Sequence, residues 1–166
     1  MSPQSDIETL ISTKSWLIEK YVAPLHHPLR ESAEKLILVS DYACRQIRLL
    51  VSLLESDSCC SLWSRESYFY AIQQISLELS QAQYTQELRR FRHTHFLRLL
   101  LLEIAGLAST QEVMQSWSDL ADSIILHTLK YIGFTLLSRY GVPRNSEGKE
   151  IQLYALAMGK LGGREL

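Results

Sequence analysis

The sequence contains few residues that interrupt helices. Glycine occurs only 7 times and proline only 4 times in 166 residues, and most of the glycines lie near the carboxyl end. Because glycine and proline are the least favourable residues inside a helix, their scarcity favours long helices over most of the chain. The late glycines indicate a different kind of structure at the end.

Cysteine is also scarce, and the three cysteines are Cys44, Cys59 and Cys60. An odd number that includes two adjacent residues makes a poor disulfide framework. The sequence has no Cys-x-x-Cys pair, so the usual spacing of a structural zinc site is missing. We therefore expect reduced thiols in a cytoplasmic protein and no metal-binding residues.

The chain has no excess of charge of either sign, with 17 Lys and Arg against 18 Asp and Glu. Its net charge of -1 gives no reason to expect nucleic acid or an anionic membrane as a partner. The amino terminus lacks a basic region followed by an apolar run, so we expect no signal peptide. Uninterrupted apolar runs, such as Leu99 to Leu102, are far too short to span a bilayer.

Apolar residues recur at helical spacing through most of the chain, which predicts a mainly α protein. Ser5 and Glu8 can form a capping box for a first helix, which Pro24 ends. Ser109 and Glu112 can form another. The expected later helices cover about residues 29–54 with a break at Ser40-Asp41, residues 68–79, residues 84–105 and residues 109–140, with Gly141 after the last.

The pattern changes after Gly141. Residues 141–150 are typical of an exposed loop, and Ile151 to Met158 form a short apolar run that predicts a buried strand. This run leads into a glycine turn at Gly159 to Gly163. Because a single strand without a partner is not stable, we interpret residues 1–148 as a helical region and residues 149–166 as the start of a truncated domain.

The last nine residues, MGKLGGREL from Met158 to Leu166, are similar to the signature of glutamine synthetase adenylyltransferases. In that family, Gly-Met-Gly-Lys-Leu-Gly-Gly-x-Glu-Leu leads to an Asn and then to an Asp-x-Asp pair. Ala157 stands where the family usually has glycine. Four earlier elements resemble the family in order: Ser40-Asp41-Tyr42, Leu88 to Arg92, Ser118 to Asp122, and Gly141-Val142-Pro143 with Gly148.

The resemblance implies a bifunctional enzyme that regulates glutamine synthetase by reversible adenylylation. One half removes AMP from a tyrosine of glutamine synthetase by phosphorolysis, which yields ADP, and the other half transfers AMP from ATP. A PII-class signal protein and glutamine set the balance. The start at Met1 and the Leu88 to Arg92 element imply the deadenylylating half.

The resemblance also implies that residues 149–166 begin a nucleotidyltransferase domain related to that of DNA polymerase β. Such a domain uses Mg²⁺ held by carboxylates. The family's Asp pair would lie beyond Leu166. We therefore expect no catalytic residue, no bound metal and no activity in this chain alone.

Gly162 and Gly163 are the candidates for phosphate contact, because glycine lets backbone amides approach an anion closely. Lys160 and Arg164 could neutralise its charge, although Arg164 is at least as well explained as a solvated side chain. Spacing alone is equally consistent with a tight turn that binds nothing, and the resemblance favours phosphate.

Arg89, Arg90 and Arg92 form the densest basic cluster, but they diverge around a helix and cannot make one nucleic-acid stripe. Beside an apolar stretch of the same helix they suggest an ion network or a bound anion. His93 and His95 point to different sides of that helix, and His26-His27 is expected to be a solvated turn.

Two other classes of function remain open. The helices could be a non-catalytic protein-interaction module. The spacing Ala157-x-Gly159-x-x-Gly162 also weakly matches a dinucleotide-binding fingerprint, which would require a helix directly after Gly163.

Overall fold

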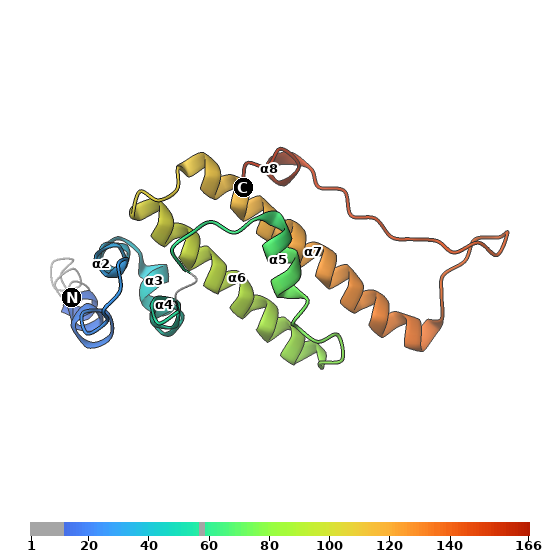
Figure 1. Cartoon of the computed structure of the whole chain (residues 1–166). Coiled ribbons are helices and arrows are strands. Elements are labelled where there is room, and N and C mark those ends of the chain that lie inside the picture. Colours follow the sequence, from blue (N-terminus) through green and yellow to red (C-terminus); the bar gives the residue numbers. More distant parts are fainter. Residues whose placement is uncertain (1–11, 57–58) are drawn as a thin grey trace, which may run out of the picture. The chain divides into compact units, whose positions relative to one another are not determined.

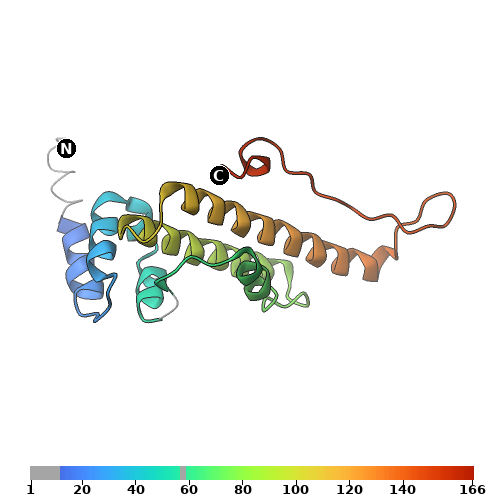
Figure 2. The same cartoon turned by 45° about the horizontal axis from the view of Figure 1, so that its top comes forward.

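The computed structural model describes residues 12–56 and 59–166, so the capping box predicted at Ser5 and Glu8 lies outside the described residues. The named helical elements are η1 (Ile18–Val22), α2 (Arg30–Val39), α3 (Asp41–Arg45), α4 (Ile47–Leu54), α5 (Arg65–Ile72), α6 (Gln81–Ile104), α7 (Thr110–Tyr140) and α8 (Gly159–Gly162) (Figures 1 and 2). Residues 12–17 are also helical and lead into η1, which has π-helical hydrogen bonding. The mainly α prediction is confirmed.

The chain divides into two compact units. The first consists of Met1–Leu62 with His93–Val113, and the second of Trp63–Arg92 with Met114–Leu166. The long helices α6 and α7 are therefore each divided between the two units. The predicted boundary between residues 148 and 149 separates a helical region from the start of another domain, and this division into two compact units does not test it. The boundary stays a prediction.

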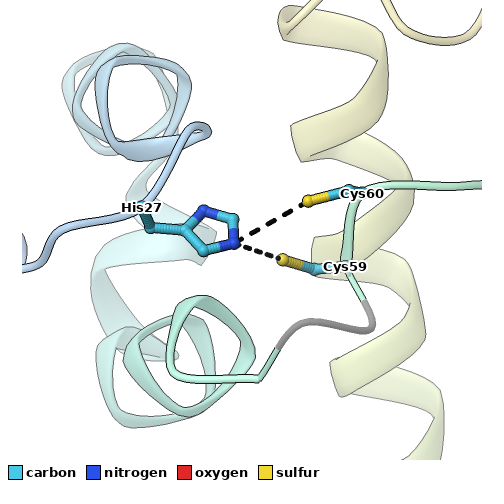
Figure 3. Close-up of side chains that lie close together, drawn as sticks. All are labelled: His27, Cys59 and Cys60. Carbon is cyan, nitrogen blue, oxygen red and sulfur yellow. Dashed lines mark hydrogen bonds between the residues drawn. The ribbon is translucent and has the colours of Figure 1, made fainter.

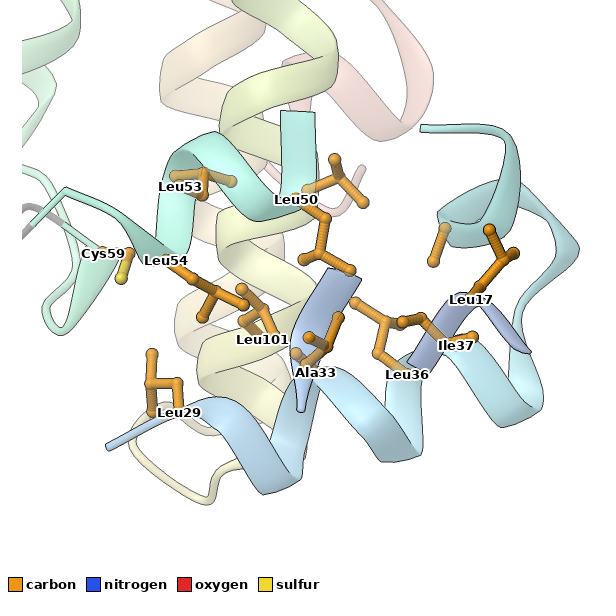
Figure 4. Packing of buried hydrophobic residues seen from close by; sticks show 13 residues of the cluster. Leu17, Leu29, Ala33, Leu36, Ile37, Leu50, Leu53, Leu54, Cys59 and Leu101 are labelled. Atoms are coloured by element: carbon orange, nitrogen blue, oxygen red, sulfur yellow. The ribbon is translucent and has the colours of Figure 1, made fainter. Parts of the chain in front are cut away.

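The first unit is built around one apolar cluster (Figure 4). Leu50, Leu53 and Leu54 lie three and four positions apart on α4, so they share one face of that helix. The apolar stretch of α6 is buried, since Leu97 and Leu101 join the cluster. The buried members are Leu17, Val22, Leu29, Ala33, Leu36, Ile37, Ala43, Leu50, Leu53, Leu54, Cys59, Leu97 and Leu101.

Local capping sets the helix boundaries where the sequence predicted them. The Ser40 side chain accepts the Ala43 amide at 3.2 Å, so α2 ends at Val39 and α3 begins at Asp41. Ser109 and Glu112 form a reciprocal capping box, in which the Ser109 amide donates to Glu112 Oε2 at 2.8 Å and the Glu112 amide donates to Ser109 Oγ at 3.3 Å.

Buried tyrosines join the helices of the second unit. The Tyr84 ring on α6 stacks on Tyr131 of α7 with a centroid distance of 3.7 Å, and the Tyr84 hydroxyl lies 2.9 Å from His127 Nδ1. Tyr68 on α5 pairs with Ser116 on α7, with 2.9 Å between their hydroxyl oxygens. These polar groups are hydrogen-bonded where they are buried, which is the condition for placing them in a core.

The carboxyl-terminal segment corrects the predicted strand. Residues 151–158 are exposed and irregular, and among the described residues no strand is formed, apart from an isolated bridge between Arg144 and Glu150. The prediction of a buried strand over Ile151 to Met158 is therefore wrong for this chain. The physical reason is that a strand is stabilised by cross-strand hydrogen bonds, and the described residues offer no partner strand.

Helix α7 bears on the expectation that the chain has no membrane partner. By length and composition alone it is apolar enough to cross a membrane, with a mean hydropathy of 1.3 over an 18-residue window of which 22% is buried. One such helix is weak evidence, because a core helix of a soluble protein has the same composition. The expectation of no membrane partner came from the net charge and from the short uninterrupted apolar runs, and it stays a prediction.

Candidate functional site

The glycine turn predicted at the carboxyl end forms a short helical turn, α8. Gly159 has φ of 63°, which is the left-handed region that glycine adopts readily. A Cβ at Gly162 would lie 2.6 Å from the carbonyl oxygen of Ala157, closer than real Cβ contacts come. At Gly163 the nearest atom, the carbonyl oxygen of Gly159, would lie at 3.4 Å. Gly162 is thus the position where the close approach of two backbone segments requires glycine.

Three amides of the turn donate within the turn itself. The Gly163 amide donates to Gly159 O at 2.9 Å, and the Glu165 and Arg164 amides donate to Lys160 O at 2.7 Å and to Leu161 O at 3.2 Å, the pair of bonds that defines a helix end of the Schellman type. Lys160 is exposed. The observed hydrogen bonding is that of a self-contained tight turn, and phosphate contact by Gly162, Gly163 and Lys160 stays a prediction.

Arg164 connects the turn to α7. Its guanidinium forms a salt bridge with Asp119, and its Nη1 lies 3.4 Å from Asp122 Oδ2. Arg65 at the start of α5 reaches the same carboxylates, with Nη2 at 3.3 Å from Asp122 Oδ2 and Nε at 3.9 Å from Asp119 Oδ1. The interpretation of Arg164 as a solvated side chain is therefore wrong, because two guanidinium groups share two carboxylates that are only 12% and 23% exposed.

The sequence reasoning missed this four-residue ion network, which we call the Arg164 clamp (Arg65, Asp119, Asp122 and Arg164). Asp119 and Asp122 are three positions apart on α7, so both carboxylates project from one face. That spacing was visible in the sequence. The partners were not, because 45 and 42 residues separate Arg164 from Asp119 and Asp122.

The basic cluster on α6 lies at the surface. Arg89, Arg90 and Arg92 are exposed, and within residues 12–56 and 59–166 no salt bridge reaches them. Farther along α6, His95 and Arg98 are buried, at 6% and 1% exposed. Burial, followed by the charge of Arg98, lowers the pKa of His95 from 6.5 to about 3. An ion network or a bound anion at the three exposed arginines stays a prediction.

A second cluster of reactive side chains lies in the first unit, where His27 points toward the two adjacent cysteines (Figure 3). His27 Nε2 lies 3.4 Å from Cys59 Sγ and 3.8 Å from Cys60 Sγ, and all three atoms fall within 4.8 Å of one another. The expected solvated turn is correct for His26 but wrong for His27, which is half-buried. Among the described residues, these three side chains are of the ligand type, and close enough together, to hold a metal ion.

Comparison with known proteins identifies the family. The family model for glutamate-ammonia ligase adenylyltransferase matches residues 31–166. A bifunctional glutamine synthetase adenylyltransferase/adenylyl-removing enzyme of Shewanella loihica is 31% identical over 129 residues, 77% of this chain and 13% of the relative. A relative of the same name from Mannheimia haemolytica is 43% identical over 79 residues, which is 48% of this chain and 8% of the relative. Another from Nitrosomonas europaea is 39% identical over 108 residues, which is 63% of this chain and 12% of the relative. No solved structure matches the chain.

These relatives define a class of adenylyl-transferring enzymes. The match covers most of this chain, and the chain belongs to the glutamate-ammonia ligase adenylyltransferase family. It spans only 8% to 13% of the length of the three relatives.

Proposed function

We propose that this chain is part of the adenylyl-removing half of a bifunctional enzyme that regulates glutamine synthetase by reversible adenylylation. In this reaction inorganic phosphate attacks the phosphorus of a tyrosyl-AMP, so that ADP forms and the tyrosine is released. The other half of such an enzyme would transfer AMP from ATP to the same tyrosine. The printed names of the relatives support this proposal, since they combine both activities.

The observation that carries the proposal is the Arg164 clamp. Apart from Arg65, its residues come from two of the five elements in which the sequence resembles the family, Ser118 to Asp122 on α7 and Met158 to Leu166 at the glycine turn. In our account α5 and α7 form a scaffold that holds the glycine turn in place. Residues 149–166 then begin the nucleotidyltransferase domain, and its strand forms when partner strands are present.

The residues of the turn would handle phosphate. Gly162 and Gly163 would offer backbone amides to a phosphate group of the nucleotide, once the hydrogen bonds within the turn are exchanged for that ligand. Lys160 is exposed and carries a positive charge beside them. Mg²⁺ would be held by an Asp pair beyond Leu166 and would neutralise charge on the transferring phosphate. This chain alone would therefore be inactive.

The proposed partners follow from the same account. Glutamine synthetase is the protein substrate, phosphate, ATP and AMP are the small ligands, and a PII-class signal protein regulates the balance in the cytoplasm. No nucleic acid or membrane is needed for the reaction.

The test compares this chain with a longer version of the protein that includes the downstream Asp pair. Both are incubated with adenylylated glutamine synthetase, phosphate and Mg²⁺, and the formation of ADP is followed. We expect ADP only with the longer protein, and loss of ADP formation when the Asp pair is replaced by Asn. ADP formation by the 166-residue chain, or by neither protein, would contradict the proposal.

One structural observation favours the alternative of a non-catalytic interaction module. A groove of about 700 Å³ lies in the second unit between α5, α7 and residues 141–154, and apolar side chains line most of it. Partner helices bind in grooves of this kind. Deletion of residues 155–166, which keeps every residue that lines the groove, separates the two proposals, since an interaction module would keep a stable fold and its partner.

A further inference from the structure

The cluster of His27, Cys59 and Cys60 has the dimensions of a zinc site but not its hydrogen bonding. Ligand atoms around a tetrahedral zinc ion lie about 3.5 to 3.8 Å apart, from bond lengths of about 2.0 and 2.3 Å. The distances of 3.4 and 3.8 Å from His27 Nε2 to the two sulfurs agree with that geometry. The outer ring nitrogen of a zinc-bound histidine, however, carries a hydrogen and donates it.

In this cluster the outer nitrogen of His27 accepts instead. The Leu29 amide donates to His27 Nδ1 at 3.0 Å. A neutral imidazole has one donor and one acceptor nitrogen, so the ring hydrogen is on Nε2, where it faces the two sulfurs. A metal ion needs the lone pair at that position. The arrangement is therefore suited to an N–H donor beside two thiols, and not to a ligand of a metal ion.

The two sulfurs differ in their surroundings. Cys59 is 0% exposed and belongs to the apolar cluster of the first unit. Its Sγ also donates to Ser56 O at 3.5 Å. Burial, and then the neighbouring Cys60, raise the pKa of the Cys59 thiol to about 11. The positive charge of Arg98 lowers this pKa, but by less. Cys60, in contrast, is exposed to solvent.

We propose that Cys60 is a site of reversible thiol modification, at which His27 Nε2–H stabilises the attacking sulfur and a small-molecule disulfide is the co-reactant. The Cys60 thiolate attacks one sulfur of the disulfide, so that a bond between Cys60 Sγ and that sulfur forms and the disulfide bond breaks. The other half leaves as a thiolate with the electron pair and then takes a proton from solvent. The product is a mixed disulfide on Cys60, and no metal or further oxidant takes part.

Cys59 lies close by but is poorly placed to displace the bound thiol. The peptide bond between Cys59 and Cys60 is trans, which fixes their Cα atoms about 3.8 Å apart. Disulfides need Cα atoms roughly 4.4 to 6.8 Å apart, so a bond between the two cysteines requires a backbone rearrangement. The mixed disulfide should therefore accumulate.

The test treats the folded 166-residue chain with oxidised glutathione and follows the adducts by intact-mass and peptide mass spectrometry. We expect one adduct, on Cys60, while Cys59 and Cys44 remain free until the chain is unfolded in urea. Cys60→Ser should remove the adduct and Cys59→Ser should keep it. His27→Ala should slow the reaction about threefold, the effect of one modest hydrogen bond, and His27→Gln, which keeps an N–H donor, should restore part of the rate.

Cys44 reports on folding in the same spectra. It is half-buried and donates to Ile37 O at 3.4 Å. A variant in which Cys44 reacts as fast as it does in urea has therefore unfolded. In that case the comparison of the parent with His27→Gln decides whether His27 speeds the reaction of Cys60. Three results would overturn the proposal: Cys59 reacts before Cys60, a Cys59–Cys60 disulfide is the main product, or Cys60 reacts with oxidised glutathione no faster than it does in urea. So would one tightly bound zinc ion that is lost in Cys59→Ser and His27→Ala.

Discussion

Arg164 in the glycine turn forms salt bridges with Asp119 and with Asp122 on α7, 45 and 42 residues earlier in the chain. Between these points the chain leaves α7 and runs back along it through exposed residues to α8 (Figures 1 and 2). The turn is therefore held mainly by this contact and by its own hydrogen bonds. Its position should depend on a few side chains that can be replaced one at a time.

Replacing Arg164 by Ala should loosen the turn with little effect on global stability. Its side chain is 33% exposed, and ion pairs near the surface contribute only about 0.2 to 1 kcal/mol to the free energy of unfolding. We expect faster trypsin cleavage at Lys160 and faster amide exchange in α8. Arg144→Ala is the matched control, because its partner Glu150 is 61% exposed and the pair lies outside the clamp. Equal cleavage at Lys160 in Arg164→Ala and the parent would contradict this account of the clamp.

Gly162→Ala should disturb the turn more than Gly163→Ala does. The added methyl group would lie 2.6 Å from the Ala157 carbonyl oxygen, so the backbone has to move, whereas at Gly163 the contact of 3.4 Å is nearly ordinary. Amide exchange of Leu161 and Gly163 by NMR measures the difference. Gly133→Ala on α7 meets nothing within 4 Å and should raise the free energy of unfolding by about 0.5 to 1 kcal/mol. Unchanged exchange in Gly162→Ala would mean that the turn does not have this geometry.

The capping box of α7 should respond to acid. The Ser109 backbone amide, and then its hydroxyl, lower the pKa of Glu112 below 4.5. The folded state therefore favours the carboxylate, so its contribution to stability is complete above the unfolded pKa and is lost as the pH falls through the folded pKa. Glu112→Gln should flatten the pH dependence of unfolding below about pH 4.5. Ser109→Ala should lower the free energy of unfolding by about 1 kcal/mol at neutral pH. An identical acid dependence in Glu112→Gln and the parent would exclude this role.

His95 should make the first unit less stable in acid. Its pKa is lowered to about 3 in the fold, so the unfolded chain takes up the proton first, at its ordinary pKa of about 6.5. Stability is therefore complete above about pH 6.5 and falls by a few kcal/mol as the pH approaches 3. His95→Leu should reduce the slope of unfolding free energy against pH in this range. A parent slope of zero would contradict the burial of a neutral His95.

The features predicted correctly from the sequence are local ones. The capping box at Ser109 and Glu112, the break at Ser40 and the helix end at Gly141 depend on residues a few positions apart, and Gly141 does adopt φ of 76°. Residues 151–158 were misjudged because apolar content does not reveal whether a partner strand is present. The contact of His27 with Cys59 spans 32 residues, and no spacing rule connects a histidine in one loop with a thiol in another.

The direction of the AMP transfer tests the central claim most directly. A longer version of the protein, with the Asp pair but without the second catalytic half, is given glutamine synthetase that carries labelled AMP, together with phosphate and Mg²⁺. In parallel it is given unmodified glutamine synthetase and labelled ATP. Our account predicts labelled ADP in the first reaction and no label on glutamine synthetase in the second. Label transferred from ATP, with no ADP formed by phosphorolysis, would contradict the assignment to the adenylyl-removing half.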